Sequence, residues 1–381
     1  MIPYGRQSIS DDDIAAVVRT LHSDWLTQGP AVPAFETAVA ARCGAQHAVA
    51  VANATAALHL ACLALDVGPG DSVWTSPNTF LASANCARYC GATVDFVDID
   101  RHTLNISLDA LAVKLRKADA ERRLPKVIIP VHFAGQPCDM EAIGKLANAY
   151  GCRVIEDAAH AIGATDCGSP VGNCAHSDIT VFSFHPVKII TTGEGGMALT
   201  NNPRLAERMA RLRSHGMVRE QASLTRDSDG PWYYEQQELG FNYRMTDLQA
   251  ALGESQLKRL DSFLHARRAI AVRYESLLTG LPLSRPLANP ERHSAWHLYP
   301  VQVAPEKRRM IFEAMRADQI GVQVHYFPVH LQPYYRKMGF KPGDFPNAES
   351  YYRGAFSLPI YPTLSEAEQE TVVNSLKKAM T

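Results

Sequence analysis

In the first half of the chain, short apolar runs alternate with longer amphipathic stretches. The runs predict strands, and the stretches between them predict helices of about 10 to 15 residues. The predicted strands are residues 48–52, 72–75, 93–97, 126–131 and 153–156, and the predicted helices are 55–65, 79–90, 108–118 and 140–149. This alternation is typical of βαβ units, and continuous apolar strands are typical of a parallel sheet with helices on both faces. We therefore expect an α/β fold with a central, mostly parallel sheet.

The two ends of the chain depart from this alternation. Ser10 and the three aspartates after it predict a helix start, because a hydroxyl and carboxylates both stabilise the free amides of a helix N-terminus. Further helices are predicted at 10–22, 33–43, 205–214 and 247–274, and further strands at 179–183 and 196–200. After Pro282 the chain is rich in proline and less regular. We predict a large domain at 1–255 and a smaller α+β domain at 256–381.

Composition and charge narrow the classes of function. The 381 residues include 38 Lys and Arg against 39 Asp and Glu, so no general attraction to nucleic acid or to an anionic membrane is expected. The basic run at 114–126 lacks interleaved aromatic residues and is interpreted as a solvated helix face. The N-terminus has no apolar signal core, and the uncharged stretch 43–65 contains Asn53 and His59. A membrane span is therefore not expected.

The eight cysteines are too sparse for a disulfide scaffold, and none forms a C-x-x-C pair. Cys86 and Cys90 are four residues apart. Without a neighbouring histidine pair, we interpret them as buried thiols rather than as metal ligands. Because reduced cysteines are typical of the cytosol, we expect a cytoplasmic protein without a metal site.

The chain contains neither G-x-G-x-x-G nor G-x-x-x-x-G-K-[ST], which argues against a Rossmann dinucleotide site and a P-loop. Two other segments follow predicted strands. Residues 53–57 (NATAA) combine small side chains with a helix start, which suits a phosphate, although Asn53 and Thr55 can equally be simple helix caps. Residues 156–160 (EDAAH) place Asp157 at the end of a buried strand and His160 three residues later. A carboxylate there needs a partner, and Asp157 could be a metal ligand, a catalytic acid or base, or the partner of a heterocyclic nitrogen. The segment could also simply be a capped helix start followed by a core histidine.

A third segment holds a lysine in apolar surroundings. Lys188 follows a predicted strand and Pro186, and a glycine-rich segment comes after it. A lysine shielded from water lowers its pKa and can attack a carbonyl as a neutral amine. Together, a phosphate cradle, an acid at a strand end and this lysine are the parts of a pyridoxal phosphate site. Phe80, which follows another predicted strand, could stack on the cofactor ring or simply pack in the core.

These segments resemble the nucleotide-sugar aminotransferases of fold type I, the DegT/DnrJ/StrS-type family. The motifs that carry the resemblance span nearly the whole chain and lie at residues 26–29, 68–71, 156–160, 183–188, 213–217 and 240–245. Residues 322–330 (VQVHYFPVH) and 357–362 (SLPIYP) resemble the pseudaminic-acid branch in particular. The resemblance implies a pyridoxal-phosphate-dependent transferase with a large domain and a small C-terminal domain.

The resemblance also implies roles for individual residues. Lys188 would form the Schiff base and shuttle the proton, Asp157 would pair with the ring nitrogen, and His160 would contact the ring hydroxyl, where many relatives have glutamine. Asn242 would reach the cofactor of a neighbouring subunit, which implies a homodimer with active sites completed across the interface. The other implied cofactor contacts are Ala54, Thr55, Phe80 and Ser183. The implied substrate contacts are Tyr4, Asp24, Trp25, Leu26, Thr27, Gln323, Val324, His325 and Tyr326.

The reaction implied by the resemblance moves an amino group from L-glutamate to C4 of a UDP-4-keto sugar. In the resembling branch the acceptor is UDP-2-acetamido-2,6-dideoxy-β-L-arabino-hex-4-ulose, and the product is UDP-4-amino-4,6-dideoxy-N-acetyl-β-L-altrosamine. Three alternatives stay open at this point. One is another UDP- or dTDP-4-keto sugar. Another is a sugar dehydratase, against which Lys188 argues because such relatives carry histidine there. The last is a non-catalytic sensor of pyridoxal phosphate or of a sugar nucleotide.

Overall fold

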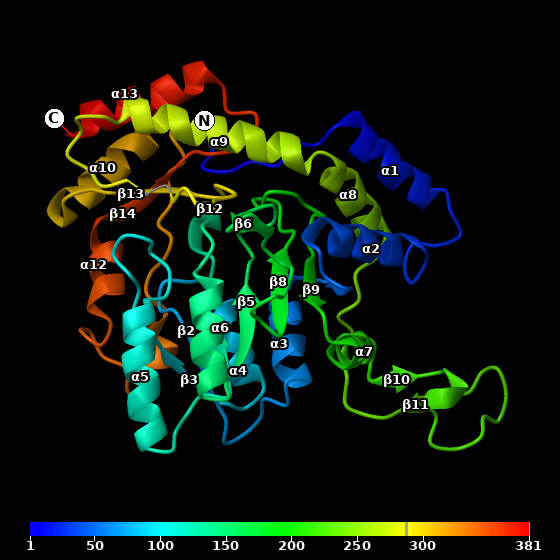
Figure 1. Ribbon diagram of the computed structural model, residues 1–381. Helices are drawn as coiled ribbons and strands as arrows, with labels where there is room; N and C mark the ends of the chain where they lie inside the picture. Colours follow the sequence, from blue (N-terminus) through cyan, green and yellow to red (C-terminus); the bar gives the residue numbers. More distant parts are fainter. Residues whose placement is uncertain (286–288, 381) are drawn as a thin grey trace.

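The computed structural model describes residues 1–285 and 289–380 and is built around one seven-stranded sheet (Figure 1). The strand order is β1-β9-β8-β5-β4-β2-β3. The strands are β1 His47–Val51, β2 Ser72–Thr75, β3 Thr93–Phe96, β4 Val127–Ile129, β5 Arg153–Asp157, β8 Ile179–Ser183 and β9 Gly196–Thr200. Only the two pairings made by β9 are antiparallel. The expected mostly parallel α/β sheet is confirmed.

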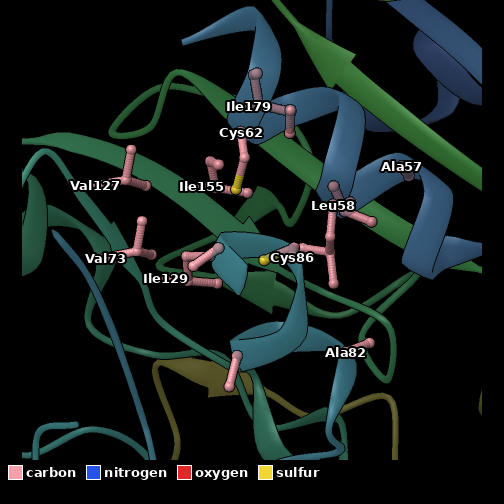
Figure 2. Close-up of a cluster of buried hydrophobic side chains, with 14 of the residues drawn as sticks. Ala57, Leu58, Cys62, Val73, Ala82, Cys86, Val127, Ile129, Ile155 and Ile179 are labelled. Atoms are coloured by element: carbon pink, nitrogen blue, oxygen red, sulfur yellow. The ribbon is translucent and has the colours of Figure 1, made fainter. Parts of the chain in front are cut away.

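Helices cover both faces of the sheet because each strand carries apolar side chains on both faces. Val127 and Ile129 pack with Ile155 among the residues of α3 Ala54–Ala64, α4 Ala82–Tyr89 and α7 Pro203–Leu212. Ile128 and Val154 point the other way, toward α5 Leu108–Ala120 and α6 Met140–Ala149. Successive strand residues face opposite sides, so each strand contributes to both cores. Figure 2 shows the first of these cores, in which Leu58 of α3 and Cys86 of α4 lie over the strands.

Three helices pack together beside β1, at one end of the sheet. They are α1 Asp11–Leu21, α2 Ala31–Cys43 and α8 Asp247–Lys258. The predicted cap of α1 is confirmed, since the Ser10 hydroxyl accepts the Asp13 amide and the Asp13 carboxylate accepts the Ser10 amide.

The C-terminal part continues from α9 Leu260–Leu277, which in Figure 1 runs along the top of the view from α8 toward the C-terminus. This part has a core of its own around Tyr299, Ile311 and Phe356. Its remaining elements are β12 Arg292–His293, β13 Tyr299–Gln302, α10 Pro305–Ala317, the 3₁₀ turn Val329–Leu331, α11 Pro333–Arg336, α12 Pro346–Gly354, β14 Ala355–Leu358 and α13 Glu366–Met380. The predicted domain boundary after residue 255 falls inside α8, and the division into 1–255 and 256–381 stays a prediction; residues 286–288 and 381 lie outside the described part.

Short elements complete the fold. They are the 3₁₀ turns Phe133–Gly135 and Gln221–Ser223 and the two-residue strands β6 Thr165–Asp166, β7 Ser169–Pro170, β10 Met217–Val218 and β11 Glu235–Gln236. β10 and β11 pair in an arm that projects from the body of the molecule (Figure 1). Among the described residues, no helix is both long and apolar enough to cross a membrane.

Three predicted elements need correction. The predicted helix 247–274 is two helices, because Arg259 leaves helical geometry (φ −101°, ψ 3°) between α8 and α9. The predicted helix 79–90 begins three residues late, at Ala82, because Ser76 to Asn78 form a turn in which the Ser76 hydroxyl accepts the Asn78 amide. The predicted strand 126–131 is only β4 Val127–Ile129, since Pro130 has no amide to donate to a neighbouring strand.

Candidate functional site

The carboxyl ends of the parallel strands open into a cavity of about 700 Å³. In an open α/β sheet, ligands bind at this edge because successive strands deliver their following loops to it. The cavity is lined by ten of the seventeen predicted site residues: Tyr4, Ala54, Thr55, Phe80, Asp157, His160, Ser183, Lys188, His325 and Tyr326. The three segments that the sequence singled out therefore meet in one place.

The start of α3 forms one wall of the cavity. Its cap is Asn53, whose side chain accepts the Ala56 amide at 2.8 Å. The amides of Ala54 and Thr55 belong to the first turn and have no acceptor within the helix. The start of α3 lies close to the backbone of Gly196 in β9. Only glycine fits there, because a Cβ would lie 2.4 Å from the carbonyl carbon of Asn53. With the buried hydroxyl of Ser183 beside them, these amides make a cradle suited to a phosphate.

Asp157 closes β5 at the bottom of the cavity and is 5% exposed. Its Oδ2 accepts a hydrogen bond from the Ser83 hydroxyl at 2.5 Å, and its Oδ1 accepts the Ala159 amide at 3.1 Å. Both carboxylate oxygens are thus held by neutral donors. Each oxygen keeps a lone pair for a further donor, such as a protonated ring nitrogen.

Lys188 lies in the loop after β8 and is partly buried. Its backbone amide donates to the His185 carbonyl at 2.9 Å, which fixes the loop. Burial lowers the pKa of the Lys188 amine to about 8, and the negative charge of Asp157 opposes part of that shift. A larger fraction of this amine is therefore neutral near pH 7 than of an exposed lysine, as a nucleophilic lysine requires.

Histidines surround the lysine, and burial keeps them neutral. Burial lowers the pKa of His160 and His297 well below the ordinary value and that of His325 to about 3; nearby Lys188 adds to each shift. The Ala134 amide donates to His160 Nδ1 at 3.3 Å, so the proton resides on Nε2, which lies 3.2 Å from the Tyr326 hydroxyl. His160 therefore presents a fixed tautomer to the cavity side of the site.

The other seven predicted contacts lie away from the cavity lining. Asp24, Trp25, Leu26 and Thr27 are exposed in the loop between α1 and α2, and Trp25 borders a separate hollow between α1 and α8. Gln323 is exposed and Val324 packs partly against the C-terminal core. Asn242 is exposed beside Ser214. Their predicted contacts with a substrate or with a neighbouring subunit's cofactor stay predictions.

Several lining residues were absent from the predicted set. Tyr243 follows Asn242 within the motif at 240–245, so the sequence offered a signal for it. Its hydroxyl lies 3.3 Å from Nδ1 of the buried His59. His297 lies in an irregular stretch that offers no pattern. Its ring centroid is 4.3 Å from that of His160, a contact that only the tertiary fold creates.

These residues fit pyridoxal phosphate. The free amides of α3 and Ser183 would hold its phosphate, Asp157 its ring nitrogen and Lys188 its carbonyl carbon. The fit rests on the chemistry of the donors: an anion cradle, an ionisable carboxylate and a lysine with a lowered pKa face one cavity.

Comparisons with known proteins agree with this chemistry. The model of the DegT/DnrJ/EryC1/StrS aminotransferase family matches residues 7–377. The spore coat polysaccharide biosynthesis protein SpsC of Bacillus subtilis is 44% identical over 384 residues, which cover 99% of this chain and 96% of SpsC. A putative sugar aminotransferase of Streptococcus pneumoniae, solved in its PMP form, superposes with a TM-score of 0.91 at 30% identity, over 100% of this chain and 99% of that one. Helicobacter pylori PseC, described as an aminotransferase in pseudoaminic acid biosynthesis, gives a TM-score of 0.90 at 29% identity, again over 100% and 99%.

Proposed function

Because the chain belongs to the DegT/DnrJ/EryC1/StrS aminotransferase family, we propose that it aminates C4 of a UDP-4-keto-6-deoxy-N-acetylhexosamine with L-glutamate as donor. The protein is a pyridoxal-phosphate-dependent sugar aminotransferase. The observation that carries the proposal is the meeting of Lys188, Asp157 and the start of α3 in one cavity. We assign the catalytic roles to Lys188, Asp157 and His160.

The chain's own groups divide the work of the reaction. When bound, the cofactor supplies an electron sink that makes the donor's Cα proton removable. Lys188 Nζ moves that proton, and the same amine returns a proton to the sugar carbon in the second half of the reaction. Asp157 would hold the ring nitrogen of the bound cofactor through its carboxylate and so favour a positive charge on that nitrogen. Tyr326 and Phe80, whose ring centroids are 6.2 Å apart, form an aromatic part of the cavity wall.

The proposed acceptor is UDP-2-acetamido-2,6-dideoxy-β-L-arabino-hex-4-ulose, and the proposed product is UDP-4-amino-4,6-dideoxy-N-acetyl-β-L-altrosamine. Similarity to H. pylori PseC over the whole chain and the segments 322–330 and 357–362 support this choice. A second candidate acceptor is a different keto sugar used for a surface polysaccharide. The higher identity to the spore coat protein of B. subtilis favours that candidate.

We also propose that two copies of the chain complete each site. A UDP-sugar carries a diphosphate, yet among the described residues that line the cavity Lys188 is the one lysine or arginine. The projecting arm exposes Trp232, Tyr234 and Leu239, which suits burial against a second subunit.

We propose that the protein is cytoplasmic. The eight cysteines are all free thiols, which supports this location.

The test is a two-stage assay on purified protein loaded with pyridoxal phosphate. First, L-glutamate should convert the absorbance band of the lysine-bound cofactor and release 2-oxoglutarate. Second, the β-L-arabino keto sugar should reverse the band and yield an amino sugar detectable by mass spectrometry. Turnover with a dTDP-4-keto sugar but not with the UDP sugar would transfer the proposal to the second candidate. A band that L-glutamate leaves unchanged would contradict the proposed donor.

A further inference from the structure

Two hydroxyl groups, those of Ser83 and Thr79, form a short hydrogen-bonded chain that ends at the Asp157 carboxylate. Ser83, in the first turn of α4, is 0% exposed, and its Oγ lies 2.5 Å from Asp157 Oδ2. Thr79 Oγ1 lies 2.7 Å from the same Ser83 oxygen. Thr79 borders the cavity, whereas Ser83 is absent from its lining. The Ser83 hydroxyl therefore acts on the cavity through its two partners, Asp157 and Thr79.

The direction of these hydrogen bonds follows from the chemistry of the groups. An ionised carboxylate has only acceptors, so the single proton of Ser83 points to Asp157. The Ser83 oxygen then accepts the proton of Thr79. The chain of donors runs from Thr79 through Ser83 to Asp157, and each donor strengthens the next by polarising it. Since Ser83 is fully buried and Asp157 is 5% exposed, water has little access to replace this donor.

We propose that Ser83 is a positioning residue that keeps the Asp157 carboxylate aimed at the cofactor ring nitrogen, with Thr79 orienting the Ser83 hydroxyl. The inference rests on the proposed role of Asp157. The Ala159 amide fixes Oδ1 and Ser83 fixes Oδ2, so the carboxylate plane is set by two donors. Without the Ser83 hydroxyl, one oxygen of this buried carboxylate loses its partner, and the carboxylate is free to rotate away from the ring nitrogen.

A purely structural role for Ser83 explains the geometry less well. A serine at a helix start usually caps the helix, but the cap position of α4 is Leu81, which makes no side-chain cap bond. The Ser83 hydroxyl lies 3.4 Å from the Phe80 carbonyl, much farther than from Asp157. Its short contact is the one with the carboxylate.

The test uses variants that separate the hydroxyl from the volume of the side chain. S83A removes the hydroxyl, and S83T and S83V form a matched pair of equal shape that differ only in it. T75V is the control, since Thr75 is also 0% exposed and its hydroxyl donates to the Ile129 carbonyl at 2.8 Å rather than to Asp157. The readouts are the dissociation constant for pyridoxal phosphate, the pH titration of the bound cofactor's absorbance, and kcat and KM for L-glutamate in the half-reaction.

The expected result is a loss that follows the hydroxyl. S83A and S83V should lower kcat about 10-fold, weaken cofactor binding and shift the pH titration of absorbance, with KM for L-glutamate nearly unchanged. S83T and T75V should match the wild type in absorbance titration. An S83A protein with wild-type titration and kcat would overturn the inference. If S83T and S83V fail to fold, the comparison of S83A with T75V alone tests it.

The D157N variant separates failure of this inference from failure of the proposed function. If D157N loses turnover while S83A behaves as wild type, Asp157 keeps its role and only the assignment of Ser83 is wrong. If D157N itself keeps wild-type turnover and absorbance, the role of Asp157 falls and the inference on Ser83 falls with it. In the double variant S83A/D157N, the loss should equal that of D157N alone, because the proposed effect of Ser83 passes through the carboxylate.

Discussion

The carboxyl ends and the amino ends of the parallel strands each border a hollow, and the two hollows are similar in size but differ in how their charged side chains are paired. At the carboxyl edge lies the cavity of about 700 Å³ around Lys188. At the amino edge, where β2 and β3 begin, lies a hollow of about 820 Å³ between the sheet and α5. The second hollow is the richer in charge: it is lined by the cations Lys114, Lys117, Arg122, Arg123 and Lys126 and by the acids Asp71, Asp95 and Glu121.

The difference lies in pairing and in contact with water. At the amino edge Lys126 lies 2.9 Å from Asp71 and Lys114 lies 2.7 Å from Asp95, and both acids are partly exposed. Both pairs are partly exposed and therefore partly screened. Burial lowers the pKa of Lys114 as well, but there the paired charge of Asp95 opposes that shift. At the carboxyl edge Lys188 faces neutral histidines, and within the described residues its Nζ makes no hydrogen bond to the protein. The number of charges in a hollow therefore says less about chemistry than the number left unpaired and shielded.

The largest expected effect is the removal of the shielded amine. K188A should abolish transfer from L-glutamate, a loss of at least about a thousandfold, because among the described residues that line the cavity Lys188 is the one amine. K117A at the amino edge should leave the rate unchanged. The measurement is the rate of 2-oxoglutarate release at saturating cofactor. A K188A protein with substantial turnover would show that the contrast between the two edges has no catalytic meaning.

A smaller and more specific effect concerns pH. Because burial lowers the pKa of Lys188 to about 8, its amine should become reactive at lower pH than an ordinary lysine of pKa 10.5. Trace labelling of the apoprotein with acetic anhydride, read by mass spectrometry, should rise with a midpoint near pH 8. Exposed Lys145 is the internal control, since its ion pair with Glu141 raises its pKa and should delay its labelling.

The sign of the partner's contribution sharpens this test. The charge of Asp157 raises the pKa of Lys188 against the effect of burial. D157N removes that charge, so the labelling midpoint should move to still lower pH. A midpoint that stays unchanged or moves upward in D157N would mean that the two groups do not face each other as the structure has them.

The carboxyl edge could largely be predicted from the sequence, for a local reason. Asp157 and Ser183 each close a strand, and residues 53–57 follow one, so each side chain is placed by a short pattern and the edge brings them together. Each of these segments can be predicted as soon as the strand that precedes it is predicted. The long-range pairings then follow from a parallel sheet.

Other features depend on contacts that no local pattern encodes. The break between α8 and α9 is one, since Arg259 turns out of the helix to bind Asp13 and the Ser8 carbonyl, far away in sequence. No glycine or proline marks it. His297 reaches the cavity from the irregular C-terminal part in the same way. The link from Ser83 to Asp157 spans two elements whose relative placement only the folded core sets.

The smallest expected effect is at the amino edge, where charge should serve stability alone. Lys114 pairs with Asp95 and lies 4.8 Å from the centroid of the Trp74 ring. K114M keeps the apolar stem against Trp74 but loses the ion pair, the ring–cation contact and the hydrogen bond to the Phe96 carbonyl, and the partly exposed Asp95 stays solvated. Urea unfolding should show a loss of about 1 kcal/mol, with cofactor binding and the rate of the half-reaction unchanged. A fall in the transfer rate at unchanged stability would mean that the two edges are coupled and that the amino-edge hollow takes part in function.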